Sequence, residues 1–159
     1  ADALNILAGH PELLDYLHRG CLLTPHMKEF ERLAGKSAND FDRLNKLSIF
    51  ARRYNVYIIL KGAYSVIATP EGQLYFNMSG NPGMAKGGCG DVLTGVLLAL
   101  AANGMELLDV ARIGVFAHGL SGDLLVREYG YRGVTSHKIA EQMGKAWKIL
   151  ENPENRNQN

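Results

Sequence analysis

Apolar residues recur at helical spacing between Asn39 and Tyr54. They fall mostly three or four positions apart, at Phe41, Leu44, Leu47, Ile49, Phe50 and Tyr54. Such spacing places them on one face of an α-helix, and Asn39 or Asp40 is a candidate N-cap at its start. The pattern predicts a surface helix over residues 39–54.

Three apolar runs around this helix have the composition of strands. Val56–Leu60 is apolar, β-branched and aromatic throughout, which is typical of a strand covered on both faces in a parallel sheet. Residues 65–69 and 74–77 flank Pro70-Glu71-Gly72, a turn-forming sequence, and predict a hairpin. Residues 21–23 form a short apolar run that ends at Thr24-Pro25, so we expect a buried strand that leads into a loop. Thr24 is a candidate cap for a short helix that ends near Leu33.

The second half of the chain is dominated by helical patterns. A glycine-rich segment at residues 81–90 precedes an apolar helix from about Asp91 to Ala102, which stops at Asn103-Gly104. Two more helices are expected at 107–127 and at 136–150, the latter capped by Thr135 or Ser136, and a flexible tail at 151–159. Together the elements describe one layered α/β domain over residues 1–150 with too few strands for a complete doubly wound sheet. We expect the missing strands to precede Ala1.

Composition restricts the class of function. The chain has 159 residues, 47% of them hydrophobic and 21% charged, with a formal net charge of +1, so one core is expected and no broad basic face for nucleic acid. No apolar run reaches the roughly 18 residues that cross a bilayer, and no signal pattern begins the chain, which predicts a soluble cytoplasmic protein. Cys21 and Cys89 are expected as reduced thiols, and the five histidines lack metal-ligand spacing, so we expect no metal held by protein ligands alone. A Mg²⁺ ion carried on phosphate remains open.

The glycine-rich segment is the strongest chemical signal. Four glycines lie within the eight positions from Gly83 to Gly90, immediately before an apolar helix. Glycines let the backbone approach a phosphate, and the unpaired amides and positive dipole end of a helix favour an anion. We therefore predict an anion hole formed by Gly87, Gly88, Cys89 and Gly90. The loop ends in Gly-Asp rather than Gly-Lys-Ser/Thr, so it is not a Walker A loop.

Asp91 is the predicted catalytic base. A carboxylate beside a phosphate repels the ligand, but it can take the proton from a substrate hydroxyl that attacks the terminal phosphorus. The alternative from spacing alone is that Asp91 is an N-cap and the glycines form a tight turn. His26 and Lys61 each follow a predicted strand, where ligands meet α/β sheets; the alternatives are a structural loop histidine and a solvated lysine.

Several sequence blocks, in order along the chain, resemble the ADP/ATP-dependent NAD(P)H-hydrate dehydratases of the ribokinase-like superfamily. The blocks are Asp2-Ala3-Leu4-Asn5, Leu23-Thr24-Pro25-His26 with Glu29-Phe30, Leu60-Lys61-Gly62-Ala63, Gly80-Asn81-Pro82-Gly83-Met84-Ala85, Gly87-Gly88-Cys89-Gly90-Asp91-Val92-Leu93-Thr94-Gly95 and His118-Gly119-Leu120-Ser121-Gly122-Asp123. The resemblance covers nearly the whole chain. It implies the carboxy-terminal part of a layered α/β/α ribokinase-like fold, with a mostly parallel sheet, a hairpin and flanking helices.

The resemblance also implies an activity. NADHX or NADPHX, hydrated on the nicotinamide ring, would be phosphorylated on the added hydroxyl with ADP or ATP and Mg²⁺, and would then lose phosphate to give NADH or NADPH, a hydro-lyase reaction. Asp91 would be the base and would contact the substrate together with His26. The nucleotide would lie on Lys61, Gly62, Ala63, Tyr64, Ser65 and Gly90. A homo-oligomer and an NAD(P)HX epimerase domain upstream, fused or separate, are further expectations.

Two alternative functions remain open from the sequence. One is a sugar or hydroxyethylthiazole kinase that uses the same Asp91, although Asn-Pro-Gly-Met-Ala argues against it. The other is a truncated nucleotide-binding module without activity, since the amino-terminal half of the family is absent. Lys86 stands where the family has a small polar residue and is expected either to pair with phosphate or to be solvated. His118 and Asp123 are expected to pack or to form hydrogen bonds between helices, and Cys89 is expected to be a small filler.

Overall fold

The computed structural model describes residues 2–152, and the chain divides into two compact units, the first unit (Ala1–Asn77) and the second unit (Met78–Asn159). The single domain expected over residues 1–150 stays a prediction. The tail expected at 151–159 lies outside the described residues from position 153 onward, whereas Glu151 is the last residue of a helix.

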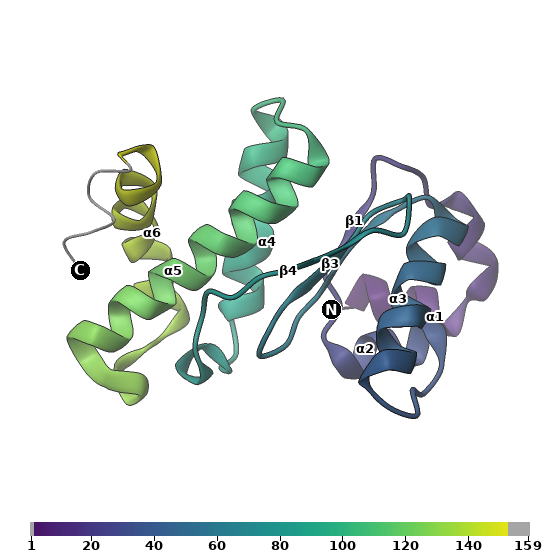
Figure 1. Cartoon of the computed structure of the whole chain (residues 1–159), viewed down its shortest axis with the longest axis horizontal. Coiled ribbons are helices and arrows are strands. Elements are labelled where there is room, and N and C mark those ends of the chain that lie inside the picture. Colours follow the sequence, from purple (N-terminus) through teal and green to yellow (C-terminus); the bar gives the residue numbers. More distant parts are fainter. Residues whose placement is uncertain (1, 153–159) are drawn as a thin grey trace. The chain divides into compact units, whose positions relative to one another are not determined.

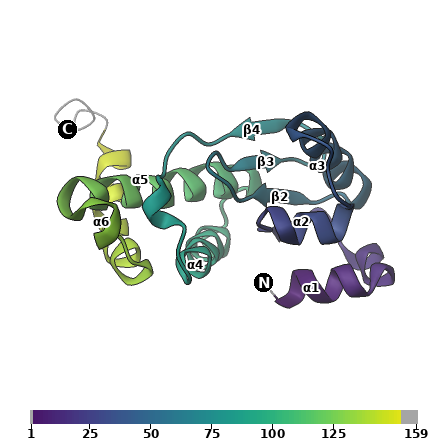
Figure 2. The same ribbon diagram turned by 90° about the horizontal axis from the view of Figure 1, so that it is seen from below.

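The first unit combines helices with a four-stranded sheet (Figure 1). Its elements are α1 (Asp2–Gly9), the 3₁₀ helix η1 (Pro11–Tyr16), β1 (Leu22–Leu23), α2 (Met27–Ala34), α3 (Asp40–Tyr54), β2 (Tyr57–Leu60), β3 (Val66–Ala68) and β4 (Leu74–Phe76). The strand order is β1-β2-β3-β4. In Figure 2, α1 and α2 lie side by side.

The expectation of a mostly parallel sheet is wrong for the described strands. β1 pairs with β2 in parallel, at Leu22↔Tyr57 and Leu23↔Ile58, but β2–β3 and β3–β4 are both antiparallel. The reason is the connection between β2 and β3, which consists only of residues 61–65. A parallel pair needs a crossover of a dozen or more residues, so a link of this length returns the chain antiparallel. The expected hairpin is confirmed, with Gly72 at a φ of 81° in its turn.

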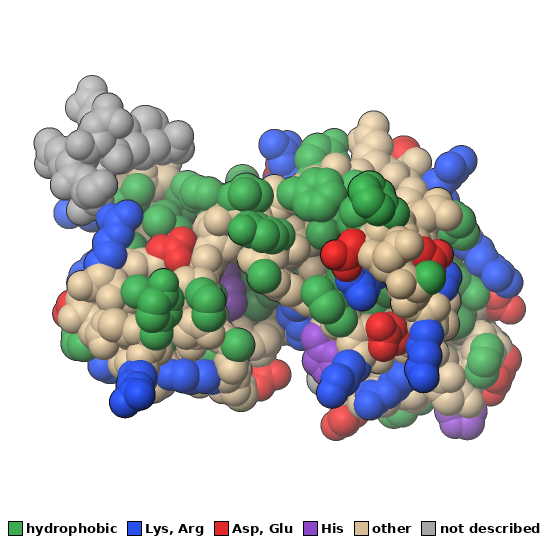
Figure 3. Space-filling model, turned by 60° about the horizontal axis from the view of Figure 1, so that its bottom comes forward, with side chains coloured by type: hydrophobic (Ala, Val, Ile, Leu, Met, Phe, Trp, Pro, Cys, Tyr) green, Lys and Arg blue, Asp and Glu red, His purple; other side chains and the backbone are tan. Residues whose placement is uncertain are grey.

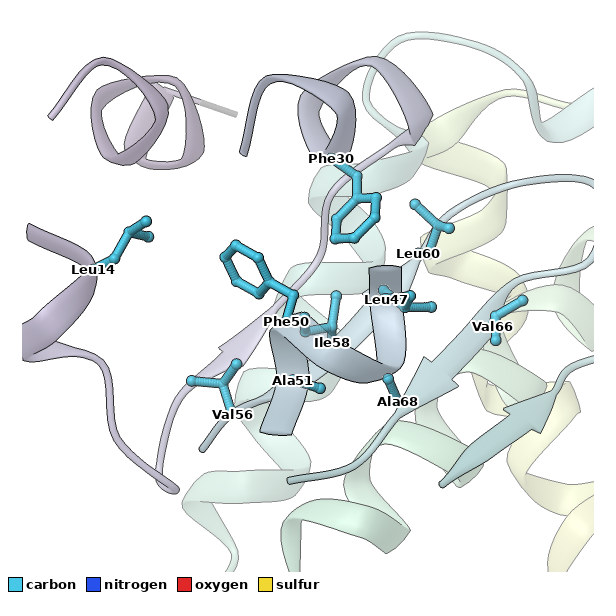
Figure 4. Close-up of a cluster of buried hydrophobic side chains, with 10 residues drawn as sticks. All are labelled: Leu14, Phe30, Leu47, Phe50, Ala51, Val56, Ile58, Leu60, Val66 and Ala68. Carbon is cyan, nitrogen blue, oxygen red and sulfur yellow. The ribbon is translucent and has the colours of Figure 1, made fainter. Parts of the chain in front are cut away.

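The core of the first unit lies between α3 and the sheet. Every residue of β2 is buried, as its unbroken apolar sequence predicts. From α3, Leu47, Phe50 and Ala51 turn toward the strands (Figure 4). The Phe50 ring also meets Phe30 of α2 edge to face, with ring centroids 6.0 Å apart. The periodic helix predicted from residue 39 is therefore confirmed, with Asn39 as its N-cap through a hydrogen bond from the Asp42 amide.

The second unit is helical. It contains the 3₁₀ helix η2 (Pro82–Met84), α4 (Cys89–Ala102), α5 (Leu107–Gly133) and α6 (Ser136–Glu151), and α5 packs against both α4 and α6. Two helix boundaries differ from the sequence prediction. α4 begins two residues before Asp91, and α5 continues past Arg127 to a break at Gly130, whose φ is 65°. Thr135 caps α6 as expected.

Surface charges on the first unit are mixed. On the face that Figure 3 shows, lysine and arginine side chains of this unit alternate with acidic ones instead of gathering in one patch. Within residues 2–152, no helix is both long enough and apolar enough to span a membrane.

Candidate active site

The parallel pair β1–β2 brings two predicted site residues together in the first unit. Beyond the last paired strand residues, the Lys61 amide donates a hydrogen bond to the Pro25 carbonyl oxygen at 2.8 Å, and His26 and Lys61 form a parallel bridge. Both residues therefore lie at the carboxyl ends of neighbouring parallel strands. Ligands of α/β proteins bind outside this edge of the sheet. The sequence prediction that both residues follow strands is confirmed.

His26 is the N-cap of α2, which corrects the expectation that Thr24 caps this helix. Its Nδ1 accepts a hydrogen bond from the Glu29 amide at 3.1 Å, and its own amide donates to Glu29 Oε2 at 2.8 Å, which completes a capping box. Because Nδ1 is an acceptor here, the other ring nitrogen, Nε2, carries the ring proton. The side chain is 50% exposed. The cap thus fixes the imidazole with Nε2 3.6 Å from Glu29 Oε2, and the exposed half of the side chain remains accessible to a ligand.

The predicted nucleotide segment is the exposed link between β2 and β3. Gly62, Ala63 and Tyr64 are exposed, while Lys61 and Ser65 are half-buried. Among residues 2–77 no hydrogen-bonding or ionic partner of the Lys61 ammonium is found. An ammonium without a partner at the end of a parallel strand is suited to a phosphate.

In the second unit, the glycine-rich loop leads directly into α4. Gly88 is the N-cap, with φ at 86° in the left-handed region. A Cβ at this position would lie 2.7 Å from Ser136 Oγ at the start of α6. Glycine is therefore required at position 88 for both backbone conformation and space. At Gly87 a Cβ would meet nothing within 4 Å.

Unpaired amides at this helix start support the predicted anion hole. Among residues 78–152, no acceptor is found for the amides of Gly87, Gly88 and Gly90. The Cys89 amide donates to the Lys86 carbonyl oxygen at 3.4 Å, so one of the four predicted donors is already paired. Free donors at the positive end of a helix dipole attract an anion.

Asp91 lies inside the first turn of α4. Its amide donates to the Gly88 carbonyl oxygen at 3.1 Å, and its side chain is exposed. The alternative that Asp91 is the N-cap is wrong, because Gly88 occupies that position. Within the described part of the second unit, no hydrogen bond or ion pair to the carboxylate is found. The carboxylate is thus available for proton transfer beside the unpaired amides.

Three other candidates have structural partners. His118 Nε2 lies 3.0 Å from the carbonyl oxygen of Cys89 in α4, which is a hydrogen bond between two helices, and Asp123 accepts hydrogen bonds from residues 80 and 81 in the segment before the glycine-rich loop. Cys89 is buried beside Leu125, Val134 and Ile139 as the expected filler.

The exposed Lys86, expected either to pair with phosphate or to be solvated, has backbone carbonyl partners that neither alternative included. Its ammonium donates to the carbonyl oxygens of Arg132 at 3.1 Å, of Tyr131 at 3.4 Å and of Val134. These carbonyls lie at the end of α5, where a helix leaves acceptors unpaired. The partners follow Lys86 by 45 to 48 residues, which is why no local pattern indicated them.

No group of three or more histidine, cysteine, aspartate or glutamate side chains within residues 2–152 could hold a metal ion. Asp91 is the only acidic residue among positions 78–91. Any Mg²⁺ at this site would therefore rest mainly on nucleotide phosphates, as Mg²⁺ commonly does.

Comparison with known proteins identifies the family. The profile described as NAD(P)H-hydrate dehydratase matches residues 1–145. The chain belongs to the NAD(P)H-hydrate dehydratase family. It is 41% identical over 151 residues to the bifunctional NAD(P)H-hydrate repair enzyme Nnr of Thermofilum pendens, an alignment that covers 94% of this chain and 29% of the relative.

Solved structures place this member of the family in a known fold. The ADP/ATP-dependent NAD(P)H-hydrate dehydratase of Bacillus subtilis, co-crystallized with ATP/Mg²⁺, matches with a TM-score of 0.76 and 31% identity, covering 81% of this chain and 47% of that one. A ribokinase-like superfamily protein of Enterococcus faecalis matches with a TM-score of 0.76 and 26% identity, covering 93% of this chain and 50% of that one. The predicted α/β ribokinase-like fold is confirmed. The chain spans from under a third to about half of the length of these proteins.

Proposed function

We propose that the protein containing this chain is a nucleotide-dependent NAD(P)H-hydrate dehydratase that returns NADHX and NADPHX to NADH and NADPH. The observation that carries the proposal is the start of α4, where unpaired glycine amides precede an exposed Asp91 in a chain of this family. Amides and carboxylate together provide an anion site and a proton acceptor, the two requirements of phosphoryl transfer to a hydroxyl.

The first step is phosphorylation of the hydrate. The Asp91 carboxylate takes the proton from the ring hydroxyl while that oxygen attacks the terminal phosphorus of the nucleotide. The bond from phosphorus to the bridging oxygen breaks, and the nucleotide leaves with one phosphate fewer. The amides of Gly87, Gly88 and Gly90 stabilise the charge on the transferring group. Mg²⁺ carried on the phosphates would neutralise part of the same charge.

The second step removes phosphate. The lone pair of the ring nitrogen displaces the phosphate by breaking its carbon–oxygen bond. A proton then leaves the neighbouring ring carbon, which restores the double bond of the dihydropyridine. One nucleotide is consumed for each cofactor repaired. His26 and Lys61–Ser65, at the strand ends of the first unit, are proposed to hold the hydrated dinucleotide and the nucleotide respectively, with Gly90 as a further nucleotide contact.

Two of the similar proteins support the proposed co-substrates and partner. The Bacillus protein is described as ADP/ATP-dependent, and we propose that either nucleotide serves here. The Thermofilum protein is described as bifunctional, and we propose that an NAD(P)HX epimerase accompanies the dehydratase, fused or separate. A homo-oligomer in the cytoplasm stays a prediction.

The test is a turnover assay on the longest natural polypeptide that contains these residues. Mixed with NADHX, Mg²⁺ and either ADP or ATP, it should restore the absorbance of NADH and release one phosphate for each NADH formed. A stable phosphorylated sugar or thiazole alcohol, without conversion of NADHX, would support a small-molecule kinase and end the proposal.

A further inference from the structure

One helix, α5, holds the segment that leads into the glycine-rich loop. Asp123 Oδ2 accepts a hydrogen bond from the Gly80 amide and Oδ1 accepts one from Asn81 Nδ2, both at 2.9 Å. Hydrogen bonds to a carboxylate are stronger than those between neutral groups. The carboxylate therefore fixes both the backbone and the first side chain of the segment.

Two glycines of α5 bring this segment into direct contact with the helix. A Cβ at Gly119 would lie 2.2 Å from Ser79 Oγ and 2.8 Å from the Gly80 amide nitrogen, and a Cβ at Gly122 would lie 2.2 Å from Met84 Sδ. Positions 122 and 123 follow position 119 by three and four residues, so each lies on the same side of the helix as Gly119. Because these two glycines have no side chain, the segment can lie directly against the face of α5 on which Asp123 binds it.

Asn81 links Asp123 to the following residues of the segment through hydrogen bonds at both ends of its side-chain amide. While its Nδ2 donates to Asp123, its Oδ1 accepts from the Gly83 amide at 3.0 Å and caps η2. The Lys86 amide then donates to the Met84 carbonyl oxygen at 2.8 Å, immediately before Gly87. Hydrogen bonds therefore run from Asp123 to the edge of the proposed anion hole.

The same helix holds the far side of the loop. The buried His118 donates from Nε2 to the carbonyl oxygen of Cys89, the first residue of α4, at 3.0 Å. His118 and Asp123 thus hold the loop at its two ends.

We propose that Asp123 is a positioning residue for phosphoryl transfer, which acts through Asn81 to fix the glycine-rich loop against Asp91. The proposal rests on the proposed function, because it assigns Asp123 a part in that reaction. Its chemical basis is that reacting groups must be held closely, since a misplacement of about 1 Å can cost about 10²-fold in rate. A purely structural role would instead lower stability and leave the rate of the folded protein unchanged.

The hydrogen-bond pattern provides a sharp test by exchange of the two side chains. In Asp123→Asn, the side-chain oxygen can still accept from the Gly80 amide, but the new NH₂ group then faces Asn81 Nδ2, so two donors oppose each other. If Asn81 flips, its Nδ2 meets the Gly83 amide instead, so neither orientation satisfies every group. In the double variant Asn81→Asp with Asp123→Asn, Asn at 123 accepts from the Gly80 amide and donates to Asp at 81, whose other oxygen accepts from Gly83. The double variant restores every bond.

The experiment measures kcat and KM for NADHX together with hydrogen exchange of the amides at 83–90, well below the melting temperature. We expect Asp123→Asn to lower kcat by up to about 10²-fold with KM little changed, and to speed exchange in the loop. The double variant should recover both. Asp109→Asn is the matched control, since Asp109 is an exposed aspartate on the same helix, and it should match the unmodified protein.

Two outcomes would overturn the proposal. One is normal kcat and normal loop exchange in Asp123→Asn. The other is a double variant that recovers neither the rate nor the exchange pattern. If the unmodified protein fails to convert NADHX, the proposed function fails by itself, and the exchange data still decide whether Asp123 orders the loop.

Discussion

The Asp91 amide donates to the Gly88 carbonyl oxygen at 3.1 Å, so Asp91 belongs to the first turn of α4 and Gly88 caps it. This relationship separates two roles that the sequence had combined in one residue. The helix start depends on Gly88 with its positive φ, so the Asp91 carboxylate is not needed as a cap and can act as a base. Substitutions at the two positions should therefore have different effects.

Gly88→Ala is expected to destabilise the second unit. An alanine in the left-handed conformation costs about 1–2 kcal/mol, and its Cβ would also lie 2.7 Å from Ser136 Oγ. The matched control is Gly87→Ala, whose Cβ would meet nothing within 4 Å. Gly87→Ala should keep the unfolding free energy and weaken nucleotide binding, because a methyl group added at the proposed anion hole hinders close approach of a phosphate to the backbone amides. Urea unfolding and nucleotide titration measure the two effects, and equal destabilisation by both variants would contradict the assignment of Gly88.

His26 is expected to combine a cap with a substrate contact, and two variants separate them. His26→Ala removes the acceptor for the Glu29 amide and should lower the unfolding free energy by about 0.5–2 kcal/mol. His26→Asn keeps an acceptor at the cap and should keep the stability, yet raise KM for NADHX because Nε2–H is lost. Thermal unfolding and steady-state kinetics test this. An unchanged KM in a stable His26→Asn variant would contradict the substrate contact and show that His26 acts only as the helix cap.

Lys86 is expected to stabilise the loop without contacting the nucleotide. Lys86→Met removes the ammonium from three carbonyl oxygens at the end of α5 and should cost about 1 kcal/mol of unfolding free energy. Nucleotide affinity should not change. Lys145→Met is the control for loss of charge, because the one ion pair of Lys145 found within residues 78–152 is an exposed pair with Glu128 at 3.8 Å, and such pairs contribute little. A clear loss of nucleotide affinity in Lys86→Met would instead indicate that the lysine contacts the phosphate.

Local patterns predicted most of the elements. Residues 39–54 and 56–60 were found because periodicity and an unbroken apolar run reflect burial directly. The hairpin was found because Pro70-Glu71-Gly72 has turn chemistry. These signals need no knowledge of distant residues.

Features that depend on distant contacts were not predicted. The three carbonyl partners of Lys86 lie at the end of another helix. Gly88 was missed as a cap because glycine has no side chain to signal it, while aspartate at 91 is a common N-cap residue. Asp123 was assigned to packing, but only the structure reveals its partners Gly80 and Asn81. A signal was available in the glycines at 119 and 122, which leave one face of α5 open for close approach.

The central claim is that Asp91 is the catalytic base, and Asp91→Asn addresses it with little effect on the fold. Because Gly88 is the cap, the loss expected is only the interaction of the charge with the helix dipole, about 0.3–1 kcal/mol. Asp109→Asn is a matched control, since Asp109 is the third residue of α5 as Asp91 is of α4, and both are exposed.

The most direct measurement is single-turnover conversion of NADHX by the Asp91→Asn protein at saturating nucleotide and Mg²⁺, beside calorimetric titration with a nucleotide that does not react. Removal of a general base should slow conversion by about 10²–10⁴-fold, while nucleotide binding stays intact or tightens because a negative charge beside the phosphates is gone. Normal conversion by Asp91→Asn would contradict the catalytic assignment, and so would a loss of nucleotide affinity that accounts for the whole loss of rate.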